Sequence, residues 1–299
     1  MSDSKIPILF DTDIGGDIDD AFCLAYLLCQ PRCELLGVTT VTGQPVVRAQ
    51  LVDAVCQAFG RREVPIHSGT GEPLLGPQRQ GDPFQKSVLP RWPHRRDFPE
   101  NTAVDFLRET IRSRPGEITL LTVGPLTNIA LLFALDPEIP RLLKRWVLMG
   151  GQFISRPAHY GLTEWNIICD PYAAAIALKA RPAETLAIGL DVTTQCRMER
   201  DEVRRRVSQG PIRVVGDMAE VWFEKREIVT FHDPLAAAVI FEPEICGYQP
   251  GLIEVELQSE RLRGLTHFNP GAAEKPHTIA TQVDPDRFFK HYFDTIERS

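Results

Sequence analysis

The sequence lacks the features that would direct a protein into a membrane or onto a nucleic acid polymer. No hydrophobic run reaches the roughly 18 residues that a membrane-spanning helix needs, so we expect no membrane partner. Lysine and arginine form no continuous basic stripe and the net charge is -7, which argues against a nucleic acid polymer as a partner. The first residues also lack a charged segment followed by an apolar one, so no signal peptide is expected and the predicted location is the cytoplasm.

Metal-binding or disulfide-forming cysteine patterns are also absent. The seven cysteines are scattered, their number is odd, and no CxxC pair occurs. This pattern predicts free, buried thiols in a reducing compartment and gives no support to a cysteine-based zinc site. Because there is no internal repeat and no low-complexity linker, residues 1–299 are predicted to form a single domain.

Short apolar runs alternate with segments of helical periodicity along most of the chain. The predicted strands are Ile6–Phe10, Leu35–Val41, Val64–His67, Ile118–Val123, Trp146–Met149 and Leu186–Leu190. The predicted helices between and after them are Ala21–Leu28, Val46–Phe59, a helix through Val104 and Ile111, Leu126–Leu135 and Pro171–Ala180. Strands that are apolar throughout and alternate with helices predict a single open, mostly parallel sheet with helices on both faces, a Rossmann-like α/β fold. Ligands of such sheets bind beyond the carboxyl ends of the strands.

Three regions depart from this alternation. Ser68–Glu100 is rich in glycine and proline and is too long for an ordinary connection, so we predict a functional loop that is mobile without ligand. Glu199–Ile228 is predicted to form two helices. Leu252–Leu257 and His277–Val283 are predicted to form a late hairpin, and Asp286–Glu297 a closing helix.

Five aspartates lie within ten residues directly after the first predicted strand. They are Asp11, Asp13, Asp17, Asp19 and Asp20 in the segment FDTDIGGDIDDA. Carboxylates crowded at one strand end repel one another unless a positive charge lies among them, and a hard divalent cation prefers oxygen ligands. The alternative is that one aspartate caps the following helix and the others face water, but a cap accounts for one or two acids and not for five.

Two other acid-rich sites were weighed for this loop. The EF-hand pattern does not fit, because its aspartate positions and its closing glutamate are missing. A phosphatase that uses a strand-end aspartate as nucleophile is an alternative, since Asp11–Thr12–Asp13 suits it. Gly15, however, stands where such an enzyme usually carries threonine or valine.

Six sequence blocks together resemble the nucleoside hydrolase family of the inosine-uridine preferring type. They are DTDIGGDIDDA (11–21), GVTTVTG (37–43), VGPLTNIA (123–130), MGG (149–151), EWNIICDPYAA (164–174) and HDPLAAA (232–238). The blocks follow the family's order over most of the chain. The acidic loop is two residues longer than the usual form and has Ile14 where proline is usual, so the role of Asp17 in the extra segment is open.

The resemblance implies a bound Ca²⁺ ion at the acidic loop. The implied ligands are Asp13, Asp20, the backbone carbonyl of Val123 and the carboxylate of Asp233. Asp13 is also the implied general base for the attacking water, and Asp19 the implied ligand of a ribose hydroxyl. His232, next to Asp233, is the implied acid that protonates the leaving base, a task suited to histidine near neutral pH.

The sugar-binding residues are only partly matched. Glu164 and Asn166 are expected to point together towards ribose from an extended segment, with Trp165 facing the core. Gln44 stands where the family usually has an asparagine that contacts the sugar. A second family asparagine corresponds to Ala158, and the substitutes considered are His159 and Tyr160.

The base-contacting stretch of the family is not visible in this sequence. Phe84 and His94 in the long loop are the candidates for a base pocket.

The expected function is therefore calcium-dependent hydrolysis of the N-glycosidic bond of ribonucleosides to ribose and free nucleobase, in purine or pyrimidine salvage. The partner is a small-molecule ribonucleoside, and the resemblance implies a homodimer or homotetramer. Two alternatives stay open: a hydrolase of another ribosyl compound, or a nucleoside- or ribose-binding protein without turnover.

Overall fold

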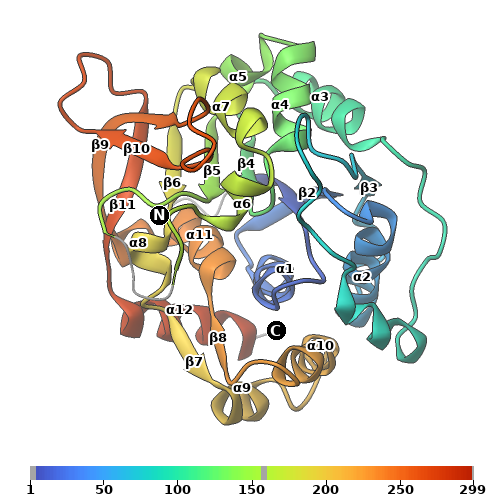
Figure 1. Cartoon of the computed structure of the whole chain (residues 1–299). Coiled ribbons are helices and arrows are strands. Elements are labelled where there is room, and N and C mark those ends of the chain that lie inside the picture. The colour runs from blue at the N-terminus through green and yellow to red at the C-terminus, as the bar shows by residue number, and fades with distance from the viewer. Residues whose placement is uncertain (1–4, 156–159, 298–299) are drawn as a thin grey trace.

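A nine-stranded open sheet forms the centre of the computed structural model, which describes residues 5–155 and 160–297. The strand order is β10-β9-β11-β6-β5-β4-β1-β2-β3 (Figure 1). The strands are β1 (Ile6–Thr12), β2 (Cys33–Thr40), β3 (Ile66–Ser68), β4 (Thr119–Thr122), β5 (Arg145–Met149), β6 (Thr185–Ile188), β9 (Cys246–Val255), β10 (Thr266–Asn269) and β11 (His277–Val283). All neighbouring pairs from β3 to β11 are parallel, and β9 is antiparallel to both β11 and β10.

Helices cover both faces of the sheet, because successive strand residues point to opposite faces and both sets of side chains are apolar. On one face Phe10, Leu121 and Val147 pack against α1 (Asp19–Cys29), α2 (Pro45–Ala58), α10 (Arg213–Phe223), α11 (His232–Phe241) and α12 (Pro285–Glu297). On the other, Leu9, Leu120 and Trp146 pack against α3 (Ala103–Ser113), α4 (Thr127–Leu135), α5 (Ile139–Leu142) and α7 (Pro171–Lys179). The predicted mostly parallel α/β fold is thus confirmed (Figure 1).

The order in which successive strands join the sheet reverses beside β1. The chain runs from β1 to β2 and β3 on one side, and β4, β5 and β6 follow on the other side. The carboxyl ends of β1 and β4 therefore diverge into loops that leave in opposite directions, which opens a crevice at that edge. The acidic loop follows β1 and Val123 follows β4, so the topology places them together.

The predicted late hairpin is wrong in its partners. Residues 246–251 of β9 pair with β11, while Leu252 to Val255 pair with β10, a strand that the sequence did not indicate. The segment expected to face His277–Val283 thus lies against a different strand. The first part of β9 pairs with β11 and the second part with β10. Hydrophobic alternation indicates which side chains are buried but not which strand is the neighbour.

Short elements were also missed in the segments between the predicted ones. Within Glu199–Ile228 the two predicted helices are α9 (Arg200–Arg206) and α10, but they are flanked by a small antiparallel sheet of β7 (Arg197–Glu199) and β8 (Ile228–Thr230). The long loop carries the 3-10 helix η1 (Phe84–Arg91), whereas β3, at its start, matches the predicted strand Val64–His67 in part. The remaining elements are α6 (Trp165–Cys169), α8 (Leu190–Thr193) and η2 (Pro243–Ile245). Among the described residues, no helix is long and apolar enough to cross a membrane.

His277 on β11 joins the antiparallel strand β9 to the helix α7, and its protonation can be used to test this link. Nδ1 of His277 accepts a hydrogen bond from Ile253 N (2.9 Å), and Nε2 donates to Leu178 O (3.0 Å). Burial lowers the pKa of His277 below its ordinary value of 6.5, so the folded state binds fewer protons than the unfolded chain when the pH falls below that value. This contribution to stability is present at neutral pH and is lost on acidification.

We expect the free energy of unfolding of the wild type, measured in urea, to fall between pH 7 and pH 5 more steeply than that of His277→Gln. His267 is exposed on β10, and His267→Gln serves as the matched control with the wild-type slope. Parallel slopes for the wild type and His277→Gln would contradict the assignment.

Candidate active site

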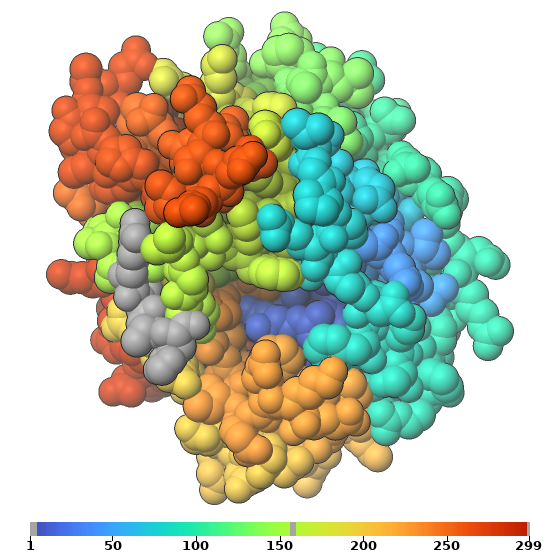
Figure 2. Space-filling model, in the orientation of Figure 1, coloured from blue at the N-terminus to red at the C-terminus, as the bar shows by residue number. Residues whose placement is uncertain are grey.

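A cavity of about 510 Å³ opens at the carboxyl edge of the sheet, at the strand reversal. Its wall includes the residues Asp13, Gly16, Asp17, Asp19, Asp20, Gln80, Phe84, Val123, Met149, Tyr160, Gly161, Thr163, Glu164, Trp165, Asn166, Leu190, Trp222, Arg226, His232 and Asp233. Figure 2 shows the opening, with residues of the N-terminal part of the chain visible at its floor. This volume suits a small organic ligand.

Four of the five clustered aspartates line this cavity, and Asp11 does not. Asp11 is fully buried, and its Oδ2 accepts hydrogen bonds from Thr39 Oγ1 (2.5 Å) and Asn128 Nδ2 (2.8 Å). It joins β1 to β2 and α4, and burial raises its pKa to about 7. Asp17, in the extra segment of the loop, faces the cavity, and burial raises its pKa to about 6.

Asp19, Asp20 and Asp233 bring their carboxylates together at the floor of the cavity. One oxygen of each lies within 4.8 Å of the others, and all three residues are buried. Asp19 Oδ2 accepts from Asp233 N (3.0 Å), and Asp20 Oδ1 accepts from Thr12 Oγ1 (2.5 Å). Burial raises the pKa of each carboxyl well above its ordinary value, and the neighbouring carboxylates raise it further. Three buried oxygen donors of like charge are the ligands that a hard divalent cation takes.

The ends of two helices supply this cluster. Asp19 and Asp20 lie in the first turn of α1, and Asp233 lies in the first turn of α11. Helix N-termini favour negative charge, which offsets part of the repulsion. The residue at the N-cap of α1 is Ile18, which makes no side-chain capping bond. Asp17 Oδ1 accepts from the N–H of Ile18 (2.6 Å), so the helix-cap alternative accounts for Asp17 but not for the buried Asp19 and Asp20.

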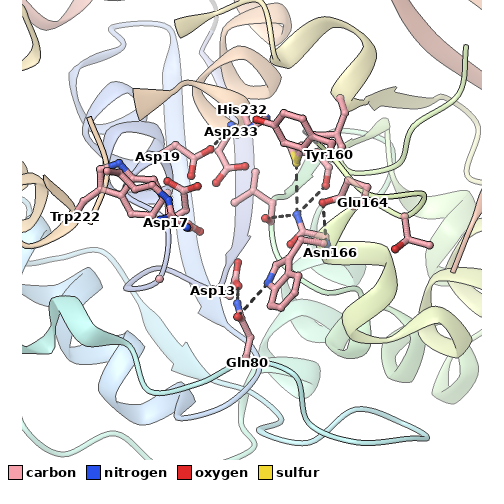
Figure 3. A pocket seen from close by; sticks show the side chains of 18 of the residues that line it. Asp13, Asp17, Asp19, Gln80, Tyr160, Glu164, Asn166, Trp222, His232 and Asp233 are labelled. Carbon is pink, nitrogen blue, oxygen red and sulfur yellow. Dashed lines mark hydrogen bonds between the residues drawn. The ribbon is translucent and has the colours of Figure 1, made fainter. Parts of the chain in front are cut away.

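Asp13 lies apart from the group of three and contacts the long loop instead. Asp13 Oδ2 accepts a hydrogen bond from Gln80 Nε2, and Gln80 Oε1 accepts from the indole of Trp165 (3.1 Å), as Figure 3 shows. Behind the loop, the buried guanidinium of Arg48 donates to the carbonyls of Asp13 and Ile14. Burial raises the pKa of Asp13, while Arg48 opposes that rise.

The prediction for Trp165 is wrong. Trp165 begins the helix α6, is 51% exposed and lines the cavity rather than the core. The helix turns the chain by about 100° per residue, so positions expected to alternate along a strand do not alternate here. Glu164 and Asn166 nevertheless both reach the cavity wall.

Glu164 and Asn166 are held by several hydrogen bonds each. Glu164 caps α6: its carboxylate accepts from the backbone N–H groups of Asn166 (2.8 Å), Ile167 (3.1 Å) and Gly151 (3.1 Å). Burial raises its pKa to about 7. Asn166 Nδ2 donates to the carbonyl of Val123 (2.8 Å). That carbonyl is the predicted metal ligand, and its second lone pair is still available.

His232 lies beside Asp233 and Tyr160 (Figure 3). Its Nδ1 is 2.7 Å from Thr193 Oγ1, and its ring meets the Tyr160 ring edge-on at a centroid distance of 6.1 Å. Burial lowers the pKa of His232 to about 4. The imidazole is therefore neutral near pH 7, and it offers a neutral N–H.

Aromatic side chains line the cavity at more than one place: Figure 3 shows Tyr160 beside His232 and Trp222 beside Asp17. Phe84 also lines the wall, and the guanidinium of Arg226 lies 5.6 Å from the centre of the Trp222 ring. Flat apolar faces with a few polar groups suit a heteroaromatic ring. Phe84 thus lies where the sequence prediction placed it.

Two predicted contact residues lie away from the cavity wall. Gln44 does not line it, and its amide donates to Asp82 in the long loop. His94 does not line it either, and its Nδ1 lies 2.8 Å from the backbone oxygen of Trp92. Both predictions relied on position in the chain, but the path of the loop puts Gln80 at the cavity instead. Ala158 and His159 lie outside the described residues.

Several cavity residues had no signal in the sequence. Gln80 and Arg48 belong to no motif, and their contacts with the acidic loop depend on the path of distant segments. Trp222 lies on a helix whose existence was predicted, but the side of that helix that meets the cavity was not.

Comparison with known proteins places these residues in context. The family model described as inosine-uridine preferring nucleoside hydrolase matches residues 8–290. Uridine nucleosidase 1 of Arabidopsis thaliana is 30% identical over 93% of this chain and 89% of its own length. The non-specific ribonucleoside hydrolase RihC of Escherichia coli is 30% identical over 94% of both chains.

Solved structures show the same fold. The purine-preferring ribonucleoside hydrolase from Gardnerella vaginalis superimposes with a TM-score of 0.84 at 25% identity, covering 98% of both chains. A plant nucleoside hydrolase superimposes with a TM-score of 0.81 at 22% identity, covering 97% of this chain and 98% of its own.

The carboxylate cluster predicts an unusual response to charge removal. In the presence of a chelator at pH 8, Asp20→Asn should raise the thermal midpoint, because it removes a buried charge and keeps an oxygen to accept from Thr12. Each kcal/mol gained would raise the midpoint by about 2–4 °C. The difference should shrink towards pH 5, because a carboxyl with a raised pKa destabilises the fold only as the pH rises.

Asp136→Asn is the matched control. The pKa of Asp136 is lowered to about 2 by its pairing with Arg112, so this change should lower the midpoint at pH 8. A lower midpoint for Asp20→Asn in chelator would show that the carboxylates do not strain the fold.

Proposed function

The chain belongs to the inosine-uridine preferring nucleoside hydrolase family, and from that premise we propose that it hydrolyses the N-glycosidic bond of ribonucleosides with the help of a bound Ca²⁺ ion. The reaction places the hydroxyl of water on C1′ of ribose, and the nucleobase departs with a proton. The observation that carries the proposal is the buried group of Asp19, Asp20 and Asp233 at the floor of a cavity with an aromatic end.

The donor set supports calcium at this floor. Every candidate ligand atom is an oxygen: Asp20 and Asp233 bring their carboxylates together at the floor, and Asp13 and the backbone carbonyl of Val123 line the same cavity. Calcium takes six to eight oxygen ligands. Its positive charge would also offset the repulsion between the carboxylates that hold it. When bound, the ion supplies positive charge that orients a water and lowers its pKa.

Carboxylates around the ribose serve the chemistry directly. Cleavage of the C1′–N bond builds positive charge on the sugar, and buried anions stabilise that charge more strongly than they stabilise the neutral substrate. We assign the ribose hydroxyls to Asp19, Glu164 and Asn166, all of which reach the cavity wall. Asp13 is assigned as the base that takes the proton of the attacking water. Its present contact with Gln80 would give way to the water.

The leaving nucleobase is assigned to the aromatic end. Phe84, Tyr160 and Trp222 provide faces on which the base can stack, and His232 lies beside Tyr160. A neutral imidazole N–H stabilises the negative charge that develops on a departing base, and it can do so because no imidazolium need form first.

The proposal is tested with a panel of purine and pyrimidine ribonucleosides, read by the release of reducing sugar. We expect turnover, about one calcium per chain, loss of turnover in chelator and recovery with Ca²⁺. Asp20→Ala should lose both the metal and the activity. Full activity in a metal-free preparation would overturn calcium dependence, and binding of nucleosides without turnover would favour a binding protein.

A second test separates activation of the leaving group from activation of the water. His232→Ala should slow inosine or uridine hydrolysis by roughly 10²–10³-fold, the effect of removing one hydrogen-bond donor to a developing negative charge. It should barely slow p-nitrophenyl riboside, whose leaving group departs without protonation. Asp13→Ala should slow both substrates, because each needs an activated water. Equal slowing of both substrates by His232→Ala would assign His232 a structural role.

A further inference from the structure

A short helix behind His232 holds the imidazole from the side away from the cavity. The helix α8 follows β6 directly, and its first residue, Leu190, lines the cavity. Asp191 and Thr193 are both buried and are absent from the cavity wall. They therefore do not reach a ligand directly, and any effect on the reaction must pass through a residue that does.

Thr193 contacts the imidazole through its hydroxyl. Thr193 Oγ1 lies 2.7 Å from Nδ1 of His232, and Thr193 is fully buried. A neutral imidazole has one nitrogen that donates and one that accepts, and the partner of one nitrogen decides which of them carries the proton. A hydroxyl that donates to Nδ1 leaves the ring proton on Nε2.

The position of this hydroxyl is set by the chain on which it lies. The carboxylate of Asp191 accepts from three successive backbone N–H groups, those of Phe153 (2.8 Å), Ile154 (2.7 Å) and Ser155 (2.7 Å). Leu190 N donates to Gly151 O (2.9 Å). The helix is thereby fixed to the segment that continues from β5.

Close approach of these two segments also depends on Gly189. A Cβ atom at position 189 would lie 2.8 Å from the backbone oxygen of Gly151. Only glycine therefore allows α8 to begin against that segment without displacement. Four of the five residues from 189 to 193 thus serve placement: Gly189 by its size, Leu190 and Asp191 by their hydrogen bonds, and Thr193 by its contact with His232.

We propose that Thr193 is a positioning residue that donates its hydroxyl hydrogen to Nδ1 of His232 and so presents Nε2–H to the leaving nucleobase. This inference rests on the proposed role of His232 in the reaction. It explains how a half-buried histidine, whose ring contacts no carboxylate among the described residues, is kept in the one tautomer that can donate into the cavity. Asp191 contributes by fixing the helix that carries the hydroxyl.

The test is Thr193→Val, which keeps the branched shape and removes the hydroxyl. In the calcium-loaded full chain we expect kcat for uridine and inosine to fall about tenfold, the effect of one lost hydrogen bond. KM should change little, because the ribose contacts are untouched. Hydrolysis of p-nitrophenyl riboside should stay near the wild-type rate. A structural defect would slow all three substrates together.

Three variants act as controls. Thr193→Ser keeps the hydroxyl and should retain wild-type rates. Thr194→Val removes a hydroxyl from the next position, which bonds to Leu190 O and not to His232, and should also retain them. In the His232→Ala background, Thr193→Val should cause no further loss, because a residue that acts through another is silent once that other is gone.

Nitrogen-15 NMR of the imidazole tests the tautomer without any turnover. The wild type should show His232 with its proton on Nε2, and Thr193→Val should shift the population towards Nδ1–H. A wild-type Nδ1–H tautomer, equal slowing of p-nitrophenyl riboside, or a further loss in the His232→Ala background would each overturn the inference. If the wild type hydrolyses no nucleoside, the proposed function fails, whereas the NMR result still decides the role of Thr193.

Discussion

Three buried carboxylates repel one another at the floor of the cavity, and the rest of the site is arranged around that repulsion. They belong to Asp19, Asp20 and Asp233, and one oxygen of each lies within 4.8 Å of the others. Like charges in a medium of low dielectric constant raise one another's pKa, and burial adds to the effect. The chain offsets the cost with two helix N-termini and with hydrogen bonds from Thr12 and the backbone of Asp233. A cation among the three carboxylates would relieve the repulsion that remains.

A buried cation of the protein itself supports the loop from behind. The guanidinium of Arg48 donates to the carbonyls of Asp13, Ile14 and Thr42, so it shapes the backbone without pairing with any single carboxylate. This leaves the carboxylate oxygens of the loop directed to the cavity, where Asp13 meets Gln80. Fixed charge behind the loop and open carboxylates in front give a site that is formed before a ligand arrives.

The cavity has two ends of different construction. The acidic floor comes from strand ends and helix starts, elements whose positions are set by the sheet. The aromatic end comes from the long loop, α10 and Tyr160, which are joined to the sheet by longer connections. In folds of this type, chemistry resides on the rigid parts and ligand preference on the variable loops. The acidic floor therefore determines the class of reaction, whereas the loops determine which base is accepted.

The sequence by itself determined the α/β alternation, the acidic loop after β1 and the family, because burial periodicity and short motifs are local properties. It also identified Asp20, Asp233 and His232, which lie in compact motifs. Only the tertiary structure decided that Gln80 and not Gln44 reaches the cavity, since that depends on the path of a loop of some thirty residues with no periodic pattern.

The structure also decided two matters that local patterns misjudged. Trp165 lines the cavity because a capped helix starts there. The capping carboxylate of Glu164 accepts from N–H groups of that helix and from the N–H of Gly151 after β5. The two halves of β9 have different neighbours, since strand alternation fixes which face is buried and leaves the choice of partner to the whole sheet. Contacts between distant segments, such as Thr193 with His232, arise only when the sheet brings the ends of its strands to one edge.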